Sequence, residues 1–177
     1  MRHVFEPAPT GRAKCRGCGR PVGKGDLRFG ERIPNPFAEG ETILWFHPLC
    51  AAYKRPEAML ETLAHAPPGS VPSPEALERA VRGNSAHRRL PRIDGADRAP
   101  TSQAKCRHCH EPITRGSWRI RLVFNEEGRF LPSGFVHLAC RAAYFEGADI
   151  LAPLLHFSPD LSDEDRADLV RACAEMA

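Results

Sequence analysis

One motif occurs twice in this sequence: two cysteines separated by two residues, then a long gap, then a histidine and a cysteine with the same short spacing. The residues of the two copies are Cys15, Cys18, His47 and Cys50, and Cys106, Cys109, His137 and Cys140. The gap is 28 residues in the first copy and 27 in the second. Such a repeat predicts two similar structural units, each built around four converging side chains.

The repeat extends beyond these residues. RAKCRGCGRPVGKGDLRF in the first copy matches QAKCRHCHEPITRGSWRI in the second, and Trp45 and Phe135 each precede their histidine by two positions. Segments that favour helix follow both copies, AAYKRPEAMLETLAHA and RAAYFEGADILAPLLHF. Ser73 and Ser162 are expected to cap one more helix in each copy. Two registers align these last helices equally well.

The chemistry of the repeated residues indicates metal binding. Three cysteines and one histidine form a four-coordinate ligand set typical of structural zinc. Thiolates and imidazole favour zinc over magnesium or calcium, and a full shell leaves no position for water. We therefore expect two structural Zn²⁺ ions. A redox-active cysteine pair, or buried cysteines at a coincidental spacing, explains neither the histidine-cysteine half nor the repetition.

Other residues of metal-binding type lie near or beyond these sets. His108 and His110 flank Cys109 but have no counterpart in the first copy, where glycines stand. We expect them on the surface. Cys173 lies on an apolar stripe with Leu169, so we expect it in the core.

These patterns predict small α+β zinc-binding modules, duplicated, each a short antiparallel sheet with a Cys3His site followed by a small helical segment. The run WRIRLVF alternates as a strand does. We expect the first module and its helical segment over residues 1–90, a linker over 91–100 and the second module over 101–177. The linker is expected because RRLPRIDGADRAP is polar, charged and interrupted by proline and glycine.

Charge is unevenly distributed along the chain. Its net value is +3, yet residues 1–141 contain 23 basic and 14 acidic residues and residues 142–177 contain 2 and 8. A basic body points mildly to a polyanionic partner, although a solvated charged face explains most such imbalances. No run approaches the roughly 18 apolar residues of a membrane span, and no secretory signal is visible. We expect an intracellular protein without a membrane partner, in bacterial cytoplasm or nucleoid, or in a eukaryotic nucleus.

The order of ligands, the gap and the flanking residues resemble the PARP-type zinc finger, the DNA-break-sensing module of poly(ADP-ribose) polymerase and of a DNA ligase. The resemblance covers residues 9–55 and 100–146 and implies a tandem arrangement without the catalytic domain. LIM and RING modules also use such pairs, but they need eight ligands per unit, and neither half of this chain has them.

The resemblance also implies particular DNA contacts. The family's backbone-gripping arginines match Arg12, Arg28 and Arg119, with Arg121 on the same expected strand as Arg119. The second copy has Gln103 at the position of Arg12, so the first copy is expected to grip phosphate better. The apolar residues that stack at a break correspond to Phe37 in the first copy and to Phe130 and Leu131 in the second.

The function that follows is a non-enzymatic, zinc-dependent DNA-binding protein that recognises strand breaks, gaps or other non-B DNA without sequence specificity. Phosphate contacts and end-stacking would provide the binding. The alternative is a protein-interaction adaptor that uses the modules as scaffolds and the acidic C-terminal helix to bind a partner. We find no catalytic motif. The choice between DNA and structured RNA stays open, as does joint binding of one site by both fingers.

Overall fold

The computed structural model describes residues 3–85 and 90–175. The chain divides into two compact units. The first unit contains Met1–Ser85 with Asn125–Phe130, and the second contains Ala86–Phe124 with Leu131–Ala177. Each unit has a three-stranded antiparallel sheet, a helical segment and one Cys3His cluster. The predicted fold class, duplicated α+β zinc-binding modules, is confirmed.

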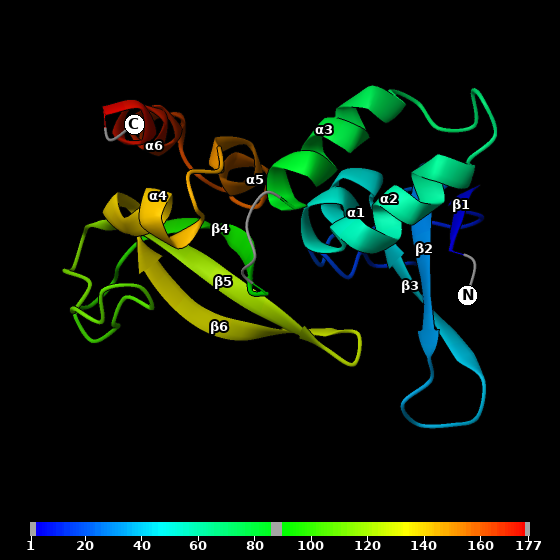
Figure 1. The fold of residues 1–177 in the computed structure, drawn as a ribbon, viewed down its shortest axis with the longest axis horizontal. Coiled ribbons are helices and arrows are strands. Elements are labelled where there is room, and N and C mark those ends of the chain that lie inside the picture. The colour runs from blue at the N-terminus through cyan, green and yellow to red at the C-terminus, as the bar shows by residue number, and fades with distance from the viewer. Residues whose placement is uncertain (1–2, 86–89, 176–177) are drawn as a thin grey trace. The chain divides into compact units, whose positions relative to one another are not determined.

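The sheet of the first unit has the order β1-β2-β3, formed by β1 (Val4–Pro7), β2 (Leu27–Pro34) and β3 (Glu41–Phe46). Three helices follow, α1 (Pro48–Lys54), α2 (Pro56–His65) and α3 (Pro74–Ser85). All three begin with proline, which lacks an amide hydrogen and is tolerated in a first turn, where that hydrogen would have no helical partner. The proline positions therefore divide this segment into three short helices (Figure 1).

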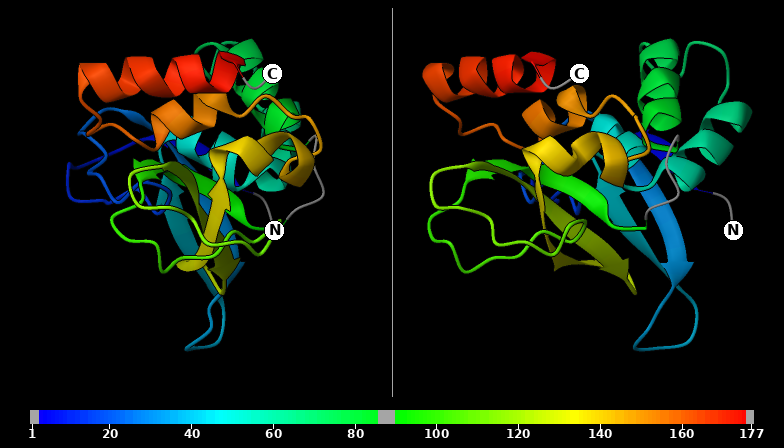
Figure 2. Two further views of the ribbon diagram at one scale, coloured as in Figure 1. Left: turned by 90° about the vertical axis from the view of Figure 1, so that its left-hand side faces the viewer. Right: turned by 60° about the vertical axis from the view of Figure 1, so that its left-hand side comes forward.

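The second unit repeats this plan with the sheet β4-β5-β6, formed by β4 (Arg92–Arg98), β5 (Trp118–Glu126) and β6 (Arg129–His137). A 3-10 helix η1 (Leu138–Cys140) leads into α4 (Arg141–Tyr144). The remaining helices are α5 (Leu151–His156) and α6 (Asp163–Glu175). Figure 2 shows these helices gathered on one side of their sheet.

The expectation of a linker at residues 91–100 is wrong for residues 92–98, which form β4, the counterpart of β1. Both strands pair antiparallel with the next strand of their sheet. An irregularity between Ile93 and Ala96 shifts the register of β4. Both residues are buried, but the irregularity places them three positions apart and breaks the alternation typical of a strand. Gly95 has φ +102° there, and a Cβ on it would lie 2.4 Å from the Phe157 carbonyl oxygen.

The two cores use equivalent positions. Phe29 on β2 corresponds to Ile120 on β5, and both are fully buried. Val22 and Ile113, just beyond the first cysteine pair of each unit, are also fully buried. The cysteine-bearing loops therefore join the metal sites directly to the hydrophobic cores.

The C-terminal helix α6 is fixed to the second sheet by its acidic first half. The Ser162 hydroxyl accepts a hydrogen bond from the Asp165 amide at 3.1 Å, which is the predicted N-cap. One helical turn on, Asp168 accepts a hydrogen bond from the Trp118 indole at 2.8 Å and pairs with Arg98 and Arg171. The indole hydrogen bond and these arginines hold the pKa of Asp168 below its ordinary value. No helix in the described ranges is long and apolar enough to cross a membrane.

Candidate metal centres and their surroundings

A tight turn in each unit carries the first two cysteines. In the first unit, the Cys15 amide donates to the Arg20 carbonyl at 2.9 Å and the Gly19 amide donates to the Cys15 carbonyl at 2.8 Å. Gly19 has φ +73°, a left-handed conformation that glycine adopts without strain. The turn brings the sulfur atoms of Cys15 and Cys18 toward one point.

The last two ligands come from the junction between the final strand of each sheet and the following helix. His47 is the residue before α1, and Cys50 lies in the first turn of that helix. His137 ends β6, and Cys140 ends the 3-10 helix η1. In each unit a helical turn follows the strand directly. This junction places the histidine and the cysteine on the same side of the chain.

The four ligand atoms of each cluster, three sulfurs and one histidine nitrogen, lie within 4.8 Å of one another. Cys18 Sγ is 3.4 Å and Cys50 Sγ is 3.9 Å from His47 Nδ1. The same two distances in the second cluster, from Cys109 and Cys140 to His137, are again 3.4 and 3.9 Å. A tetrahedral zinc ion with bonds of about 2.3 Å to sulfur and about 2.0 Å to nitrogen separates these atoms by about 3.6 Å. The side chains therefore fit zinc.

The second ring nitrogen of each histidine, Nε2, lies within hydrogen-bonding distance of a backbone carbonyl. His47 Nε2 is 3.1 Å from the Pro21 carbonyl, and His137 Nε2 is 3.2 Å from the Pro112 carbonyl. A carbonyl only accepts, so Nε2 carries the hydrogen and Nδ1 keeps its lone pair for the metal. Outer partners of this kind orient metal-binding histidines.

Burial raises the pKa of the cysteine thiols, and hydrogen bonds from backbone amides lower it. Burial raises the pKa of Cys106, but hydrogen bonds from the Cys109 and His137 amides lower it to about 7. Burial, helped by a hydrogen bond with Cys109, raises the pKa of Cys140 to about 12. Sulfurs this close oppose each other's ionisation, and a divalent cation stabilises all three thiolates together.

The chain therefore contains two Cys3His sites typical of structural zinc, as predicted. Four protein ligands fill a tetrahedral shell, so the chemistry such an ion supplies is cross-linking of the fold and not activation of water. His108 and His110 are exposed and belong to neither cluster, and Cys173 is buried with Leu169, also as predicted.

The predicted DNA-contacting arginines Arg28 and Arg119 lie in equivalent, buried positions. Arg28 is 7% exposed, its Nη2 and Nε lie 2.5 and 3.2 Å from Glu6 Oε1, and its guanidinium lies 3.5 Å from the centre of the Trp45 ring. Arg119 is 8% exposed and makes two hydrogen bonds to Asp97, at 2.9 and 3.1 Å. Each arginine thus has a carboxylate on the neighbouring strand.

Sequence reasoning missed these carboxylates. Glu6 lies opposite Arg28 in the β1-β2 register, and Asp97 lies opposite Arg119 in the β4-β5 register. The signal was the equal separation of the two acids from their arginines along the chain. This spacing did not predict an ion pair, because residue 97 was expected in a linker and not in a strand.

Arg121 is also engaged inside the second unit. Its Nη2 donates to the Asp94 carbonyl at 2.8 Å and to the Phe157 carbonyl at 3.3 Å. Its Nη1 lies 3.9 Å from an Asp97 oxygen. The side chain therefore connects the irregular part of β4 to the end of α5.

The remaining predicted contacts differ in exposure. Arg12 is exposed on the loop before Cys15, and no carboxylate of the described residues lies within ion-pairing distance of it. Phe37, on the loop between β2 and β3, is 78% exposed. Leu131 on β6 is 42% exposed. Phe130 is half-buried within the first unit, its ring edge-on to Phe46 at 6.2 Å.

The fold and the two sites define a class of protein, one of duplicated Cys3His zinc-binding modules. No family model matches the sequence. Poly [ADP-ribose] polymerase 1 of Oryza sativa subsp. japonica is 26% identical over 163 residues, 83% of this chain and 16% of the polymerase. Poly [ADP-ribose] polymerase of Drosophila melanogaster is 24% identical over 159 residues, 80% of this chain and 16% of the polymerase.

The similarity and the two clusters together fit a PARP-type zinc finger. The matched region spans only 16% of the length of either relative. The activity, substrates and partners of the whole polymerases therefore do not transfer to this chain.

Proposed function

We propose that this chain is a zinc-dependent DNA-binding protein that recognises strand breaks, gaps or other non-B DNA without reading sequence. The observation that carries the proposal is the pair of matching Cys3His clusters within a region similar to poly(ADP-ribose) polymerases over about four-fifths of the chain. The tandem PARP-type arrangement is part of the same proposal.

Phe37 supports the recognition of breaks. A phenylalanine that is 78% exposed gains little from burial within its own fold. The Arg129 guanidinium lies 5.6 Å from the centre of its ring, and most of the ring is available to cover another apolar face. An intact duplex offers no free base-pair face, whereas a nick or an end does. Stacking on such a face contributes about 1–3 kcal/mol per base. Leu131 is the corresponding candidate in the second unit.

Arg12 supports the phosphate contact. It is exposed, and no ion pair with a described carboxylate competes for its guanidinium. Arg28 and Arg119 are less available than Arg12, because both are buried and a carboxylate engages Nε and Nη2 of each guanidinium. Arg121 is engaged as well, because it donates to the backbone carbonyls of Asp94 and Phe157.

The test is fluorescence anisotropy of the zinc-loaded chain with nicked, gapped and intact duplexes of equal length and sequence, with a structured RNA as a further ligand. The nicked and gapped duplexes should bind more tightly. Equal affinity for all duplexes at moderate salt would remove break recognition, and no affinity for any nucleic acid would remove the proposal altogether.

The adaptor alternative has less support. It relies on the acidic C-terminal helix, but Asp165 and Asp168 are engaged in the cap of α6 and in its attachment to the second sheet. The comparisons give no protein partner for this helix. Capture of a defined protein by the chain without any DNA affinity would favour this alternative.

A further inference from the structure

The two cysteine turns have the same backbone and can be compared residue by residue. We call residues 14–21 the first zinc knuckle and residues 105–112 the second zinc knuckle. A β-bridge closes each one, between Lys14 and Pro21 and between Lys105 and Pro112. In both, the amide after the first cysteine donates to the strand that leads to the histidine, at 2.8 Å. Side chains at equivalent positions therefore occupy equivalent places.

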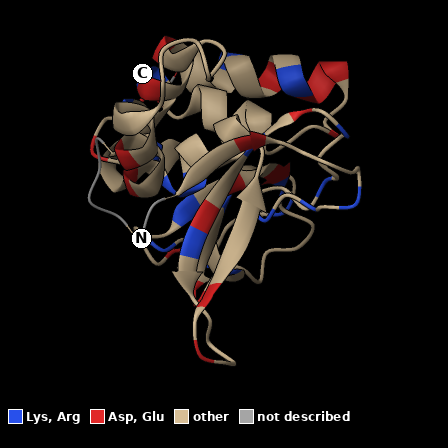
Figure 3. Ribbon diagram, turned by 90° about the vertical axis from the view of Figure 1, so that its right-hand side faces the viewer, with Lys and Arg blue, Asp and Glu red and all other residues tan. Residues whose placement is uncertain are grey.

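The charges at these positions are not equivalent. The first zinc knuckle has three exposed cations, Lys14, Arg16 and Arg20. No carboxylate of the described residues lies within ion-pairing distance of any of them. The loop between β1 and β2, on which the first zinc knuckle lies, also contains Arg12 and Lys24. Figure 3 colours the Lys and Arg residues of the described chain blue.

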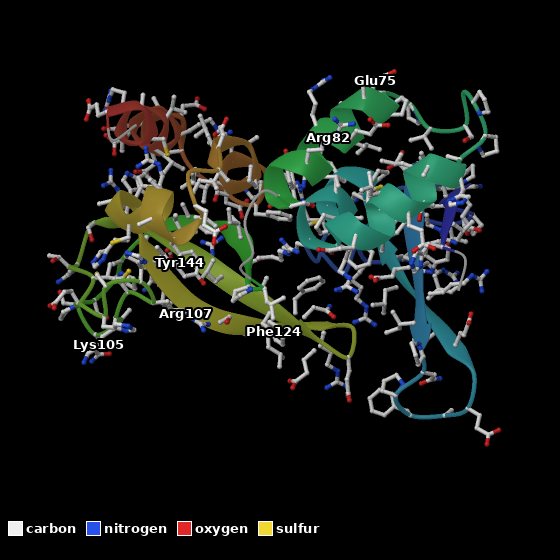
Figure 4. The ribbon with its side chains drawn as sticks, in the orientation of Figure 1. Glu75, Arg82, Lys105, Arg107, Phe124 and Tyr144 are labelled. Atoms are coloured by element: carbon white, nitrogen blue, oxygen red, sulfur yellow. The ribbon has the colours of Figure 1, made fainter. Side chains whose placement is uncertain are left out.

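The second zinc knuckle has two cations and an acid at the same positions. Glu111 stands where the first has Arg20. Arg107 is partly engaged, because its Nη1 donates to the Ser133 carbonyl at 2.6 Å and to the Ser133 hydroxyl at 2.5 Å. Lys105 is exposed, and Figure 4 shows it on the loop that carries the cysteines.

The charge of the metal cluster makes the difference in net charge between the two zinc knuckles more important. A zinc ion with three thiolates and a neutral histidine has a net charge of −1. The three cations of the first zinc knuckle exceed that charge by two, whereas the side-chain charges of the second knuckle only balance it. Arg20 stands two positions after the ligand Cys18 and offsets the charge of the cluster, so Lys14 and Arg16 remain as exposed cations in excess of it.

We infer that the first zinc knuckle, through Lys14 and Arg16, is a binding surface for nucleic-acid phosphates, and that the second zinc knuckle is not. This inference rests on the proposed DNA-binding function and adds residues to it. Lys14 and Arg16 flank a zinc ligand on a turn closed by hydrogen bonds, so their backbone is fixed before binding. They contribute affinity but do not distinguish a break from an intact duplex, because phosphates are present in both.

The chain provides its own matched control for the test. The variant Lys14→Gln/Arg16→Gln removes two charges from the first zinc knuckle, and Lys105→Gln/Arg107→Gln removes two from the same positions of the second. Anisotropy with nicked and intact duplex is measured from 50 to about 300 mM salt. On B-DNA, the slope of log affinity against log salt falls by about 0.9 for each phosphate that the protein no longer neutralises. We expect the first variant to reduce the slope by nearly 2 and the affinity at least tenfold, equally on both duplexes.

The second variant should reduce the slope by less than 1 and the affinity by at most about threefold. Zinc content, measured on the same samples, should stay at two ions per chain, so that the effect of removing charge is not confused with the effect of removing zinc. Equal reductions for both variants, or an unchanged slope for the first, would overturn the inference and leave the proposed function intact. A wild-type chain that binds neither duplex would instead refute the proposed function.

Discussion

Arg119 and Asp97 form a two-pronged ion pair across neighbouring strands, with Nε and Nη2 at 2.9 and 3.1 Å from the two carboxylate oxygens. The ring of Phe135 covers the guanidinium at 3.8 Å. Arg28, Glu6 and Trp45 repeat this arrangement in the first unit. An arginine between a carboxylate and an aromatic ring is held in one conformation. Each of these arginines therefore stabilises its own sheet. A phosphate that binds the same guanidinium nitrogens must compete with the carboxylate.

The substitution Asp97→Asn tests this competition. Loss of the carboxylate charge leaves the buried Arg119 guanidinium without an anionic partner, so the second unit should lose about 1–3 kcal/mol of stability. The freed guanidinium should raise DNA affinity severalfold. Thermal unfolding and anisotropy measure the two effects, with Asp160→Asn as an exposed control. Lower DNA affinity would show that the carboxylate positions the arginine for phosphate and does not compete with it.

The substitution Phe37→Ala tests end-stacking. The side chain is 78% exposed, so stability should change by less than about 0.5 kcal/mol. Affinity for nicked or gapped duplex should fall by a factor of about 5 to 150, equivalent to the 1–3 kcal/mol that stacking contributes, and affinity for intact duplex should stay the same. Leu60→Ala, at an exposed apolar position of α2, is the matched control. An equal reduction on broken and intact duplexes would exclude stacking at the break.

Much of this structure could be predicted from the sequence, for identifiable reasons. A zinc ion restricts ligand type, number and spacing, so the eight ligands were visible as a pattern. The strand β5 and the cap at Ser162 follow from local chemistry in the same way, although the burial along β5 does not alternate. None of these needed knowledge of distant contacts.

The features that were missed depend on the pairing of strands. The irregularity of β4 between Ile93 and Ala96 removed the alternation expected of a strand. Without β4, neither the pairing with Asp97 nor the burial of Arg119 could be foreseen, and Arg119 was expected only as a DNA-contacting arginine. The partner of Arg28 was hidden for a related reason, because Glu6 lies opposite it only in the register of the folded sheet.

The cysteine turns differ in strain as well as in charge. His110 has φ +65° at the position where the first turn has Gly19 with φ +73°. A left-handed conformation costs a non-glycine residue about 1–2 kcal/mol. We expect His110→Gly to stabilise the second unit by about 1 kcal/mol and Gly19→Ala to destabilise the first by a similar amount. Thermal unfolding with zinc present measures both, and a destabilised His110→Gly variant would contradict the strain.

Zinc content should respond to each site independently. The substitution Cys15→Ser should lower the content from two ions per chain to one, and Cys106→Ser should do the same at the other site. Cys173→Ser is the matched control, since this buried thiol belongs to neither cluster and its replacement should leave both ions in place. Elemental analysis of purified variants measures the content. Two zinc ions in Cys15→Ser would contradict the assigned ligands.

The central claim is that two zinc-bound modules recognise broken DNA. Its most direct test is a competition titration in which unlabelled nicked and intact duplexes displace a labelled gapped duplex from the zinc-loaded chain. We predict that the nicked duplex competes at least tenfold better and that a chelator which removes zinc abolishes binding of both. Equal competition by the two duplexes, or binding that survives the removal of zinc, would contradict the claim.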